Sequence, residues 1–486
     1  MDKQELMKQV EQYIDRNRDA IVEDLKTLVR IPSISVEGDE EKPFGEECAR
    51  ALDQALSMAK ERGFYVNNHD YWYGTALYGC EKSDNGLIGI FSHLDVVEVG
   101  DNWIYEPFEP IEKEGFLIGR GAGDNKSGAV VGMYAMQAVK ELNIPLRSNL
   151  MLYFGCNEEK GMKDIERFAK EHLMPDYSMV PDLFFPVCCG EKGNLKLSLQ
   201  AKKGFVQIME FSGGKAENMI PEKAEAKICP CPGLYEQAAS AAGSREDIRV
   251  RESDGMIIVT AFGTGGHSSM PEGTIDAIWV LADFLKGLEA LDPSDREICG
   301  SMAEFTGDYE GKTLGINWSD EPSGKLVCAA VKARMDGTLP EILFNIRYPV
   351  TDYRERIETE LLKVITGKGF VVKDITNNGP LYLSKEDPYV QTLMNVYHEV
   401  TGLEREPYVI DGGTYARKLK HAVGYGGGNG AHADFLPPGH GRVHQPDEAR
   451  NIQGILEAIK IYVMSILAID EMIQKEREEK TGEQIR

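Results

Sequence analysis

The chain has 486 residues and a formal net charge of -25 at pH 7. This acidic excess argues against nucleic-acid or anionic-membrane partners, which are bound through clustered cations. Hydrophobic residues make up 42% of the chain and charged residues 27%, which is typical of a soluble globular protein with two or three domains. No apolar run reaches the roughly 18 residues that a membrane span needs, and residues 1–24 contain no signal-peptide core.

The nine cysteines are scattered through the chain and odd in number. This usage favours free thiols in a reducing compartment over a disulfide framework, so we expect a cytoplasmic protein. The pairs Cys188–Cys189 and Cys229–Cys231 lack a second pair at zinc-site spacing, and incidental thiols are the simpler interpretation.

The first 190 residues alternate between helical and strand patterns. Apolar residues at helical spacing predict helices over residues 2–31, 46–62 and 125–141. Apolar runs predict strands at residues 64–68, 74–78, 87–92 and 150–154. This alternation is typical of an α/β domain with a mostly parallel central sheet flanked by helices.

The pattern changes after Gly193, and residues 195–378 predict an inserted α+β domain. Strands are expected at residues 195–200, 204–211, 255–262 and 343–348. Helices are expected at residues 222–226, 233–242, 274–291 and 353–367. The chain then returns to the first domain with helices over residues 388–401 and 451–474. We therefore expect one domain from residues 1–194 and 379–486, interrupted by the insertion.

The strand at residues 87–92 leads into His93-Leu94-Asp95. Residues two apart on a strand point the same way, so His93 and Asp95 should lie side by side at the carboxyl end of the strand. Open α/β sheets bind their ligands at this edge. A carboxylate beside a histidine is the pairing that a metal-bound imidazole requires, although the triplet alone is a weak signal.

Five residues of metal-ligand type fall where strands end or in glycine-rich turns: His93, Asp124, Glu159, Asp182 and His444. Two histidines and three carboxylates fit a pair of divalent ions that share a bridging carboxylate, with zinc, cobalt and manganese all acceptable. Asp124 is the natural bridge, because glycines around it let the backbone approach closely.

Glu158 directly precedes Glu159 after the strand at residues 150–154. Neighbouring side chains diverge, so Glu159 can bind a metal while Glu158 faces a water molecule as general base. A pair of glutamates is more often a solvated helix start, but its position after an apolar strand favours the functional interpretation.

Six short blocks follow one another across nearly the whole chain: Ser-His-Leu-Asp-Val-Val (92–97), Gly-Arg-Gly-Ala-Gly-Asp-Asn-Lys-Ser-Gly (119–128), Asn-Glu-Glu-Lys-Gly (157–161), Pro-Asp with Gly-Glu-Lys-Gly (181–193), Gly-His (266–267) and His-Gln-Pro-Asp-Glu (444–448). In content and order they resemble the dinuclear metallopeptidase family of aminoacylase, carboxypeptidase G and the bacterial PepV-type dipeptidases. The resemblance implies a catalytic domain with an inserted lid domain at residues 195–378.

The resemblance also implies two divalent ions per chain, with zinc expected first and manganese or cobalt as alternatives. His93, Asp124 and Asp182 would hold one ion, and Asp124, Glu159 and His444 the other. Asp95 would orient His93, and Glu158 would act as general base.

Further motifs resemble the PepV-like dipeptidases: Ala-Glu-Asn-Met-Ile-Pro (216–221), Gly-His-Ser-Ser-Met-Pro (266–271), Phe-Asn-Ile-Arg-Tyr-Pro (344–349) and Gly-Gly-Thr-Tyr-Ala-Arg (412–417). By this resemblance His267 would stabilise the oxyanion and Asn218 would bind near the scissile carbonyl. Arg347 would pair with the substrate's terminal carboxylate through its planar guanidinium group. Thr414 is a further substrate-binding candidate.

The resemblance thus implies a dipeptidase that hydrolyses short peptides by a metal-bound water. A deacylase of N-acyl amino acids would use the same site, and the sequence does not place the anchor for a free N-terminus that separates the two. A non-catalytic binding protein is a third hypothesis, disfavoured because all five ligands and Glu158 are present.

Two features depart from the family pattern. The segment before His444 is rich in glycine and histidine, so His432 and His440 are rival candidates for the last ligand. The insertion is long, which resembles the PepV arrangement in which one chain supplies the whole active site. We therefore expect a monomer or weak dimer whose only required partner is a small peptide substrate.

Overall fold

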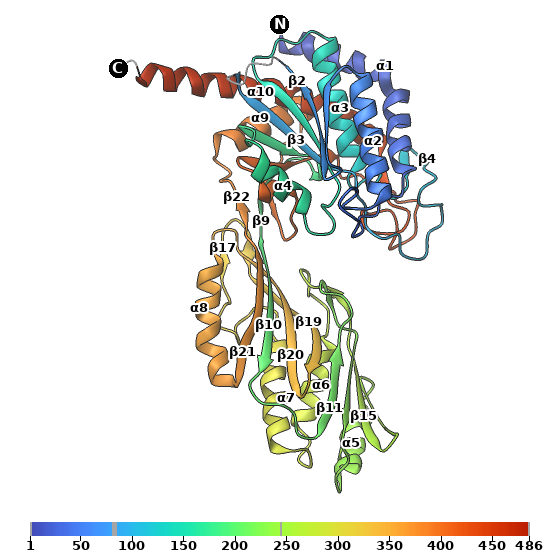
Figure 1. Ribbon diagram of the computed structural model, residues 1–486, viewed down its shortest axis with the longest axis vertical. Helices are drawn as coiled ribbons and strands as arrows, with labels where there is room; N and C mark the ends of the chain where they lie inside the picture. Colours follow the sequence, from blue (N-terminus) through green and yellow to red (C-terminus); the bar gives the residue numbers. More distant parts are fainter. Residues whose placement is uncertain (1, 80–84, 244, 485–486) are drawn as a thin grey trace. The chain divides into compact units, whose positions relative to one another are not determined.

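The computed structural model describes residues 2–79, 85–243 and 245–484 (Figure 1). These residues form two compact units. The described residues of Met1–Cys189, Leu383–Tyr408 and Gly413–Arg486 make up unit 1, and Gly190–Tyr382 and Val409–Gly412 make up unit 2. The predicted α/β fold class is confirmed. The domain boundaries expected at residues 194/195 and 378/379 stay predictions, and the sequence did not indicate that residues 409–412 join unit 2.

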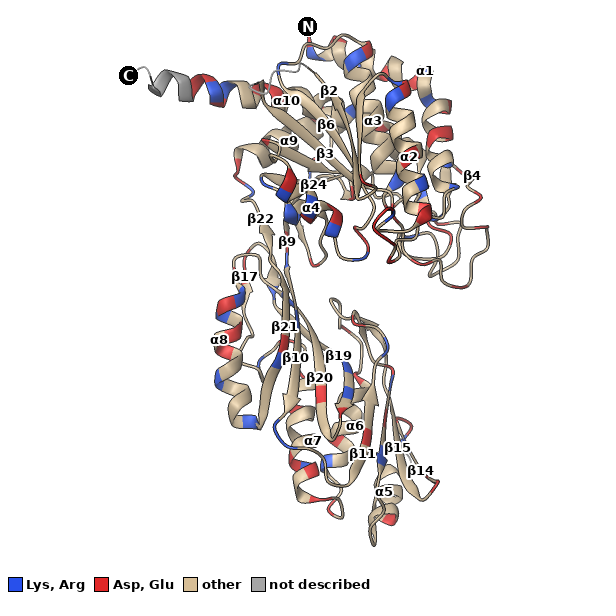
Figure 2. Cartoon of the chain, in the orientation of Figure 1, with Lys and Arg blue, Asp and Glu red and all other residues tan. Residues whose placement is uncertain are grey.

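A buried parallel sheet forms the centre of unit 1. Its neighbouring parallel strands are β6 (Asn149–Gly155), β3 (Leu87–His93), β7 (Tyr177–Val180) and β24 (Ala422–Tyr425). None of the four contains Asp, Glu, Lys or Arg. The labelled strands β3, β6 and β24 are tan along their length in Figure 2. Antiparallel strands extend the sheet at both sides: β1 (Tyr65–His69), β2 (Tyr73–Tyr78) and β9 (Val187–Glu191). Strand β3 thus lies between two parallel neighbours, which is why its sequence is continuously apolar.

In the described part of unit 1, six helices accompany the sheet: α1 (Lys3–Val29), α2 (Glu46–Glu61), α3 (Lys126–Glu141), α4 (Lys163–Glu171), α9 (Pro388–Thr401) and α10 (Ile452–Gln484). Helix α3 packs against β3 and α10, and nearly every one of its residues is buried. Short elements complete the unit: β4 (Ile111–Lys113), β5 (Phe116–Ile118), β8 (Leu183–Phe184), η3 (Tyr415–Lys418), β25 (Gly427–Gly428) and β26 (Ala449–Asn451). Strands β22 (Leu381–Tyr382) and β23 (Tyr408–Ile410) pair with β9.

Helix α10 is long and apolar enough over Ile452–Glu479 to cross a membrane by length and composition, an exception to the prediction that no segment reaches that length. However, 72% of its most apolar window is buried inside the protein. The helix packs against α1, α3 and α9. Its apolar character is therefore accounted for by its place in the core.

Unit 2 is built on one antiparallel sheet with the strand order β14-β15-β13-β11-β19-β20-β10-β21. The strands are β10 (Gly193–Ala201), β11 (Ile208–Gly213), β13 (Lys223–Ile228), β14 (Ile248–Ser253), β15 (Met256–Phe262), β19 (Val327–Asp336), β20 (Leu339–Tyr348) and β21 (Phe370–Asn378). The helices are α5 (Leu234–Ala242), α6 (Ala277–Lys286), α7 (Pro293–Thr306), α8 (Arg354–Ile365) and η2 (Thr366–Lys368). Two short antiparallel pairs complete the described part of the unit: β12 (Met219–Ile220) with β16 (Gly266–His267), and β17 (Ser319–Asp320) with β18 (Gly324–Lys325).

The two faces of this sheet differ in chemistry. Alternate residues of β10 and β20, such as Leu197 and Phe344, join the apolar core formed with α6 and α7. The residues between them, such as Lys196 and Glu341, point to the opposite face. Figure 2 shows basic and acidic residues side by side on the strands of unit 2, in contrast to the uncharged parallel strands of unit 1.

The helix predicted at residues 222–226 is wrong. This segment is strand β13, which pairs with β11 and β15. Its residues favour helices, but Ala224, Ala226 and Ile228 are buried at alternate positions, so sheet packing overrides local propensity. The predictions also omit helix α7, although Asp292 and Pro293 supply an N-cap and a first-turn proline.

Candidate metal centre

Three neighbouring parallel strands deliver polar residues to one edge of the unit 1 sheet. His93 is the last residue of β3, Glu158 and Glu159 follow β6, and Asp182 follows β7. Asp124 lies just before α3 and His444 lies in the loop before β26. Because the carboxyl ends of parallel strands meet at one edge, residues far apart in the sequence come together here.

The two histidines both contact Asp124, through different carboxylate oxygens. Nε2 of His93 lies 3.0 Å from Oδ1 of Asp124 and 3.5 Å from Oδ1 of Asp182. Nε2 of His444 lies 2.9 Å from Oδ2 of Asp124 and 3.1 Å from Oε1 of Glu159. Asp124 thus occupies the central position between the two imidazoles.

The ligand atoms fall into two overlapping clusters among the described residues. In His93, Asp124 and Glu159, and again in His93, Glu158 and Asp182, the possible ligand atoms all lie within 4.8 Å of one another. Glu158 is therefore as near to His93 and Asp182 as a ligand would be. Neither His432 nor His440 belongs to these clusters, and His440 instead contacts the carboxylate of Asp447 through Nδ1.

The donor set fits divalent cations. Nε2 of His93 is buried and forms no regular hydrogen bond within the described part of the chain, although two carboxylate oxygens lie within 3.5 Å. Imidazole nitrogens and carboxylate oxygens that converge in this way suit zinc, manganese or cobalt.

The charges of the cluster are unbalanced. Burial would lower the pKa of His93, but Asp182 and the neighbouring carboxylates raise that pKa well above its usual value. Hydrogen bonds to Asp124 and Glu159 raise the pKa of His444 to about 11, and burial raises the pKa of Asp182 to about 7. With Glu158 there are four carboxyl groups for two imidazoles, so the site favours additional positive charge.

The two imidazoles differ in exposure and backbone geometry. The side chain of His93 is fully buried, whereas that of His444 is 53% exposed. His444 has a φ of 64°, in the left-handed region that non-glycine residues rarely adopt. This left-handed backbone conformation is strained, and surrounding structure must hold it in place. Strained residues of this kind are common at functional sites.

Asp95 supports the site differently from the sequence-based expectation. Nδ1 of His93 lies 2.8 Å from the backbone oxygen of Asp95 and 3.5 Å from its carboxylate. The carboxylate oxygens of Asp95 accept the backbone N–H groups of Glu158 and Glu159, each at 3.1 Å. Asp95 therefore fixes His93 mainly through its carbonyl group and fixes the glutamate pair through its side chain.

Two further buried carboxylates hold the turns that carry the site, and the sequence did not identify them. Asp164 accepts the backbone N–H groups of Cys156 and Asn157 at 2.8 and 3.0 Å. Glu448 accepts the backbone N–H groups of Gly123 and Asp124 at 2.7 and 2.9 Å. The only sequence signal for Glu448 was its place in the block that contains His444.

The remaining predicted residues lie in separate places. In unit 2, β12 pairs Met219 with His267, and the backbone N–H of Ser268 donates to the carbonyl of Asn218 at 2.9 Å. The structure thus brings Asn218 and His267 together. Arg347 lies on β20, two residues after Asn345, whose side chain donates to the carbonyl of Glu217 at 3.1 Å. In unit 1, the Thr414 hydroxyl caps η3 by accepting the N–H of Ala416 at 3.1 Å.

Residues 89–468 match the model of peptidase family M20/M25/M40. The chain belongs to this family. The resemblance is thereby confirmed at the level of the family, and the chain is an M20 peptidase. The PepV-like subtype stays a prediction.

Curated relatives match this M20 peptidase along almost their whole length. "Putative dipeptidase YtjP" of Bacillus subtilis is 31% identical over 468 residues, which cover 93% of this chain and 97% of the relative. "Putative dipeptidase SAUSA300_1697" of Staphylococcus aureus is 27% identical over 474 residues, 95% of this chain and 98% of the relative.

Solved structures share the fold of this M20 peptidase. The dipeptidase Dug1p from Saccharomyces cerevisiae has a TM-score of 0.57 at 12% identity, covering 96% of this chain and 98% of that one. Human carnosine dipeptidase 1 has a TM-score of 0.53 at 17% identity, covering 96% and 100%.

Proposed function

We propose that this M20 peptidase is a PepV-like dipeptidase that hydrolyses short peptides with two divalent ions and a glutamate general base. The observation that carries the proposal is the convergence on Asp124 of His93 and His444, with Glu159 and Asp182 beside them. The relatives named as putative dipeptidases, which it matches along almost their whole length, support the choice of substrate.

The metal ligands are proposed in two sets that share Asp124. His93 and Asp182 would complete one set, and Glu159 and His444 the other. Zinc is the expected metal, with manganese or cobalt as alternatives. Bound there, the ions would supply Lewis acidity toward the scissile carbonyl and the attacking water.

Glu158 is proposed as the general base. Its carboxyl group lies in the cluster with His93 and Asp182, and its backbone is tied to Asp95. From this place Glu158 would take a proton from the attacking water and return it to the nitrogen of the leaving amine.

Unit 2 is proposed to act as a lid that completes the active site from the same chain. His267 would stabilise the oxyanion, Asn218 would bind near the scissile carbonyl, and Arg347 would pair with the terminal carboxylate of the peptide. Thr414 would contact substrate from unit 1. We therefore propose a monomer or weak dimer, which sedimentation of the protein would test.

A cytoplasmic location is also proposed. Eight of the nine cysteines lie among the described residues and all eight are free thiols, while Cys80 lies outside the described residues. Free thiols of this number suit a reducing compartment.

The test is hydrolysis of a dipeptide panel beside N-acetyl amino acids. Metal-stripped protein is reloaded with zinc, manganese or cobalt, and Glu158→Ala is compared with Glu289→Ala, an exposed glutamate of unit 2. We expect metal-dependent cleavage of dipeptides that is lost in Glu158→Ala and unchanged in Glu289→Ala. Cleavage of acyl amino acids alone would replace the proposal by a deacylase, and cleavage of neither class would refute both.

A further inference from the structure

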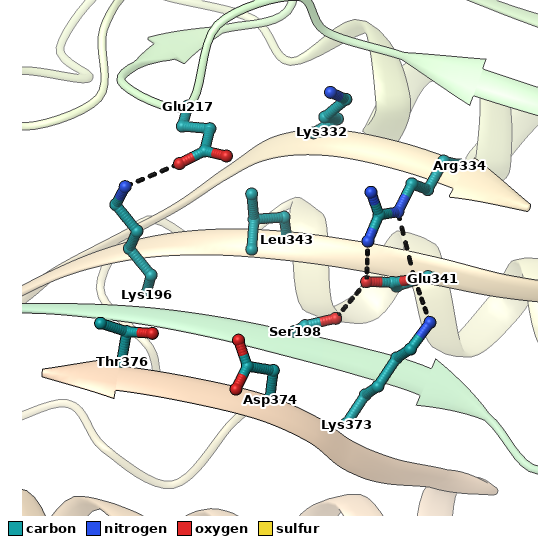
Figure 3. Close-up of a pocket in the computed structure, with 10 residues that line it drawn as sticks. All are labelled: Lys196, Ser198, Glu217, Lys332, Arg334, Glu341, Leu343, Lys373, Asp374 and Thr376. Carbon is teal, nitrogen blue, oxygen red and sulfur yellow. Dashed lines mark hydrogen bonds and ion pairs between the residues drawn. The ribbon is translucent and has the colours of Figure 1, made fainter. Parts of the chain in front are cut away.

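The face of the unit 2 sheet opposite its helices contains a hollow of about 470 Å³. Side chains from β10, β19, β20 and β21 form its floor and sides, and Glu217 contributes a further wall (Figure 3). The volume is within the range of small-molecule sites, about 300–1,000 Å³. None of the metal-centre residues lines it.

Two β-bulges shape the hollow. On β19, Ala330 pairs with Phe344 and Lys332 pairs with Leu343, so Val331 is an extra residue. On β21, Asp374 pairs with Ser198 and Val372 with Leu199, so Lys373 is extra. Bulges bend a strand and redirect its side chains, which explains how the consecutive residues Lys373 and Asp374 both line the hollow.

Ion pairs within the protein close the two ends of the hollow. At one end, Nζ of Lys196 lies 2.6 Å from Glu217. At the other, the carboxylate of Glu341 binds Arg334 at 2.9 Å and Lys373 at 2.8 Å (Figure 3). Nζ of Lys373 also lies 3.0 Å from Asp336, so three cations face three carboxylates. These ion pairs hold the side chains at the two ends of the hollow in place.

Two charged residues of the hollow, Lys332 and Asp374, differ from the ion-paired residues at its ends. Within the described ranges neither forms an ion pair or a side-chain hydrogen bond, and both face the hollow. They lie at opposite ends of one row across the sheet, Lys332-Leu343-Ser198-Asp374. Three strand spacings of about 4.8 Å place their backbones about 14 Å apart. The partly buried side chain of Leu343 lies between them (Figure 3).

We propose that this hollow binds a zwitterionic amino acid or short peptide, with the carboxylate toward Lys332, the ammonium group toward Asp374 and an apolar side chain on Leu343. The choice of amino acids and peptides as ligands rests on the proposed function, since they would be its products and substrates. Glu217, in the wall, directly precedes Asn218, so a bound ligand would contact the segment proposed to hold substrate.

The test follows the methyl signals of Leu343, assigned with Leu343→Ile, in full-length Glu158→Ala protein without metal. Titration with leucine should shift these signals saturably. Lys332→Met and Asp374→Asn should each weaken binding at least tenfold, whereas Lys203→Met, an exposed lysine of the same unit, should not. Thermal melting of each variant verifies folding. Absence of a saturable shift, or equal binding by the variants, would overturn the proposal.

Ligand analogues test the two charges separately. N-acetylleucine lacks the ammonium group and leucinamide lacks the carboxylate, so each should bind at least tenfold more weakly than leucine. If either binds as tightly as leucine, the zwitterion assignment is wrong. Comparison of leucine with Leu-Leu then identifies whether product or substrate is preferred.

A further variant and the inactive background separate this site from the proposed active site. If Arg347→Met abolishes the shift while Lys332→Met preserves it, the ligand binds at Arg347 and the hollow is not a site. Because Glu158→Ala protein without metal is used, the result does not depend on turnover. A chain that binds leucine in the hollow but cleaves no dipeptide would retain this inference and lose the proposed function.

Discussion

The phenol of Tyr415 donates a hydrogen bond to the buried carboxylate of Asp164. The same carboxylate accepts two backbone N–H groups at residues 156–157, and Asp95 accepts the next two at residues 158–159. Four consecutive N–H groups after β6 are thus held by two carboxylates. The turn that presents the glutamate pair is therefore fixed from α4, from η3 and from the end of β3.

Replacing Asp164 by Asn should impair the centre without touching a ligand. The amide offers one acceptor oxygen in place of two and cannot carry the charge that strengthens these hydrogen bonds. Residues that support metal ligands in this way typically contribute about 10–100-fold to metal affinity or activity. We expect losses of this size in zinc affinity by calorimetry and in kcat, with a smaller loss for Tyr415→Phe. Asp283→Asn, on α6 of unit 2, is the matched control, and unchanged zinc affinity in Asp164→Asn would contradict the assignment.

The Arg120–Glu448 pair should contribute to both stability and the geometry of Asp124. Both side chains are 1% exposed and their charged atoms lie 2.7 Å apart. Arg120→Met leaves the Glu448 charge buried without its partner, which costs about 3–5 kcal/mol in unfolding free energy. The double variant Arg120→Met/Glu448→Gln should be less destabilised than Arg120→Met, because no unpaired charge remains. Urea unfolding of the wild type, Arg120→Met, Glu448→Gln and the double variant measures the coupling free energy between the two residues. Purely additive effects would show that the pair does not act as a unit.

The proximity of the metal-type residues could be predicted from the sequence, because it follows from strand polarity alone. A strand that ends in His93 and a parallel neighbour that ends before Glu158 must bring these residues to one edge. Their individual roles stay predictions. Strand order could not predict that His444 lies beside Asp124 and Glu159, because His444 belongs to a loop and not to a strand. Its place among the predicted ligands depended on the family motif.

The supporting residues could not be predicted, because they act through backbone groups distant in sequence. Tyr415 and Asp164 are separated by 251 positions. A buried carboxylate that accepts N–H groups looks in the sequence like any helix-start aspartate. The same limit explains the wrong helix at residues 222–226, where partner strands rather than local propensity decide the conformation.

The stability of unit 2 should depend on pH through Glu341. Burial would raise the pKa of Glu341, but hydrogen bonds from Arg334, Lys373 and Ser198 outweigh it and lower the pKa to about 2. Since the pKa is 4.5 without these contacts, the ionised form favours folding. Its contribution is complete above about pH 4.5 and is lost as the pH falls toward about 2.

Glu341→Gln should therefore be less stable than the wild type near pH 7, by about 1–3 kcal/mol, and the difference should shrink below pH 4.5. Hydrogen exchange of the β20 amides across this pH range measures the stability difference between the two proteins at this strand. Glu289→Gln, an exposed substitution in the same unit, should show no such pH dependence. A difference that stays constant from pH 7 to pH 3 would contradict the role of the ion pairs.

Metal-dependent stabilisation should separate Glu158 from Glu159. A ligand that binds only the folded protein stabilises it by about 2.7 kcal/mol when present at 100 times its dissociation constant. We expect zinc to raise the melting temperature of the wild type and of Glu158→Ala alike, because the proposed base is not needed to hold the ions. Glu159→Ala should lose much of this effect together with activity, because His444 and Asp124 then lack their third partner.

The opposite pattern of zinc stabilisation would exchange the roles proposed for Glu158 and Glu159. Glu158 lies within 4.8 Å of the ligand atoms of His93 and Asp182, as Glu159 does of His93 and Asp124. If Glu158→Ala abolishes the zinc-induced rise in melting temperature and Glu159→Ala preserves it, Glu158 is the ligand and Glu159 must be considered as the base. Retention of the rise in both variants would mean that neither glutamate binds the metal, because each variant would still hold zinc without its carboxylate.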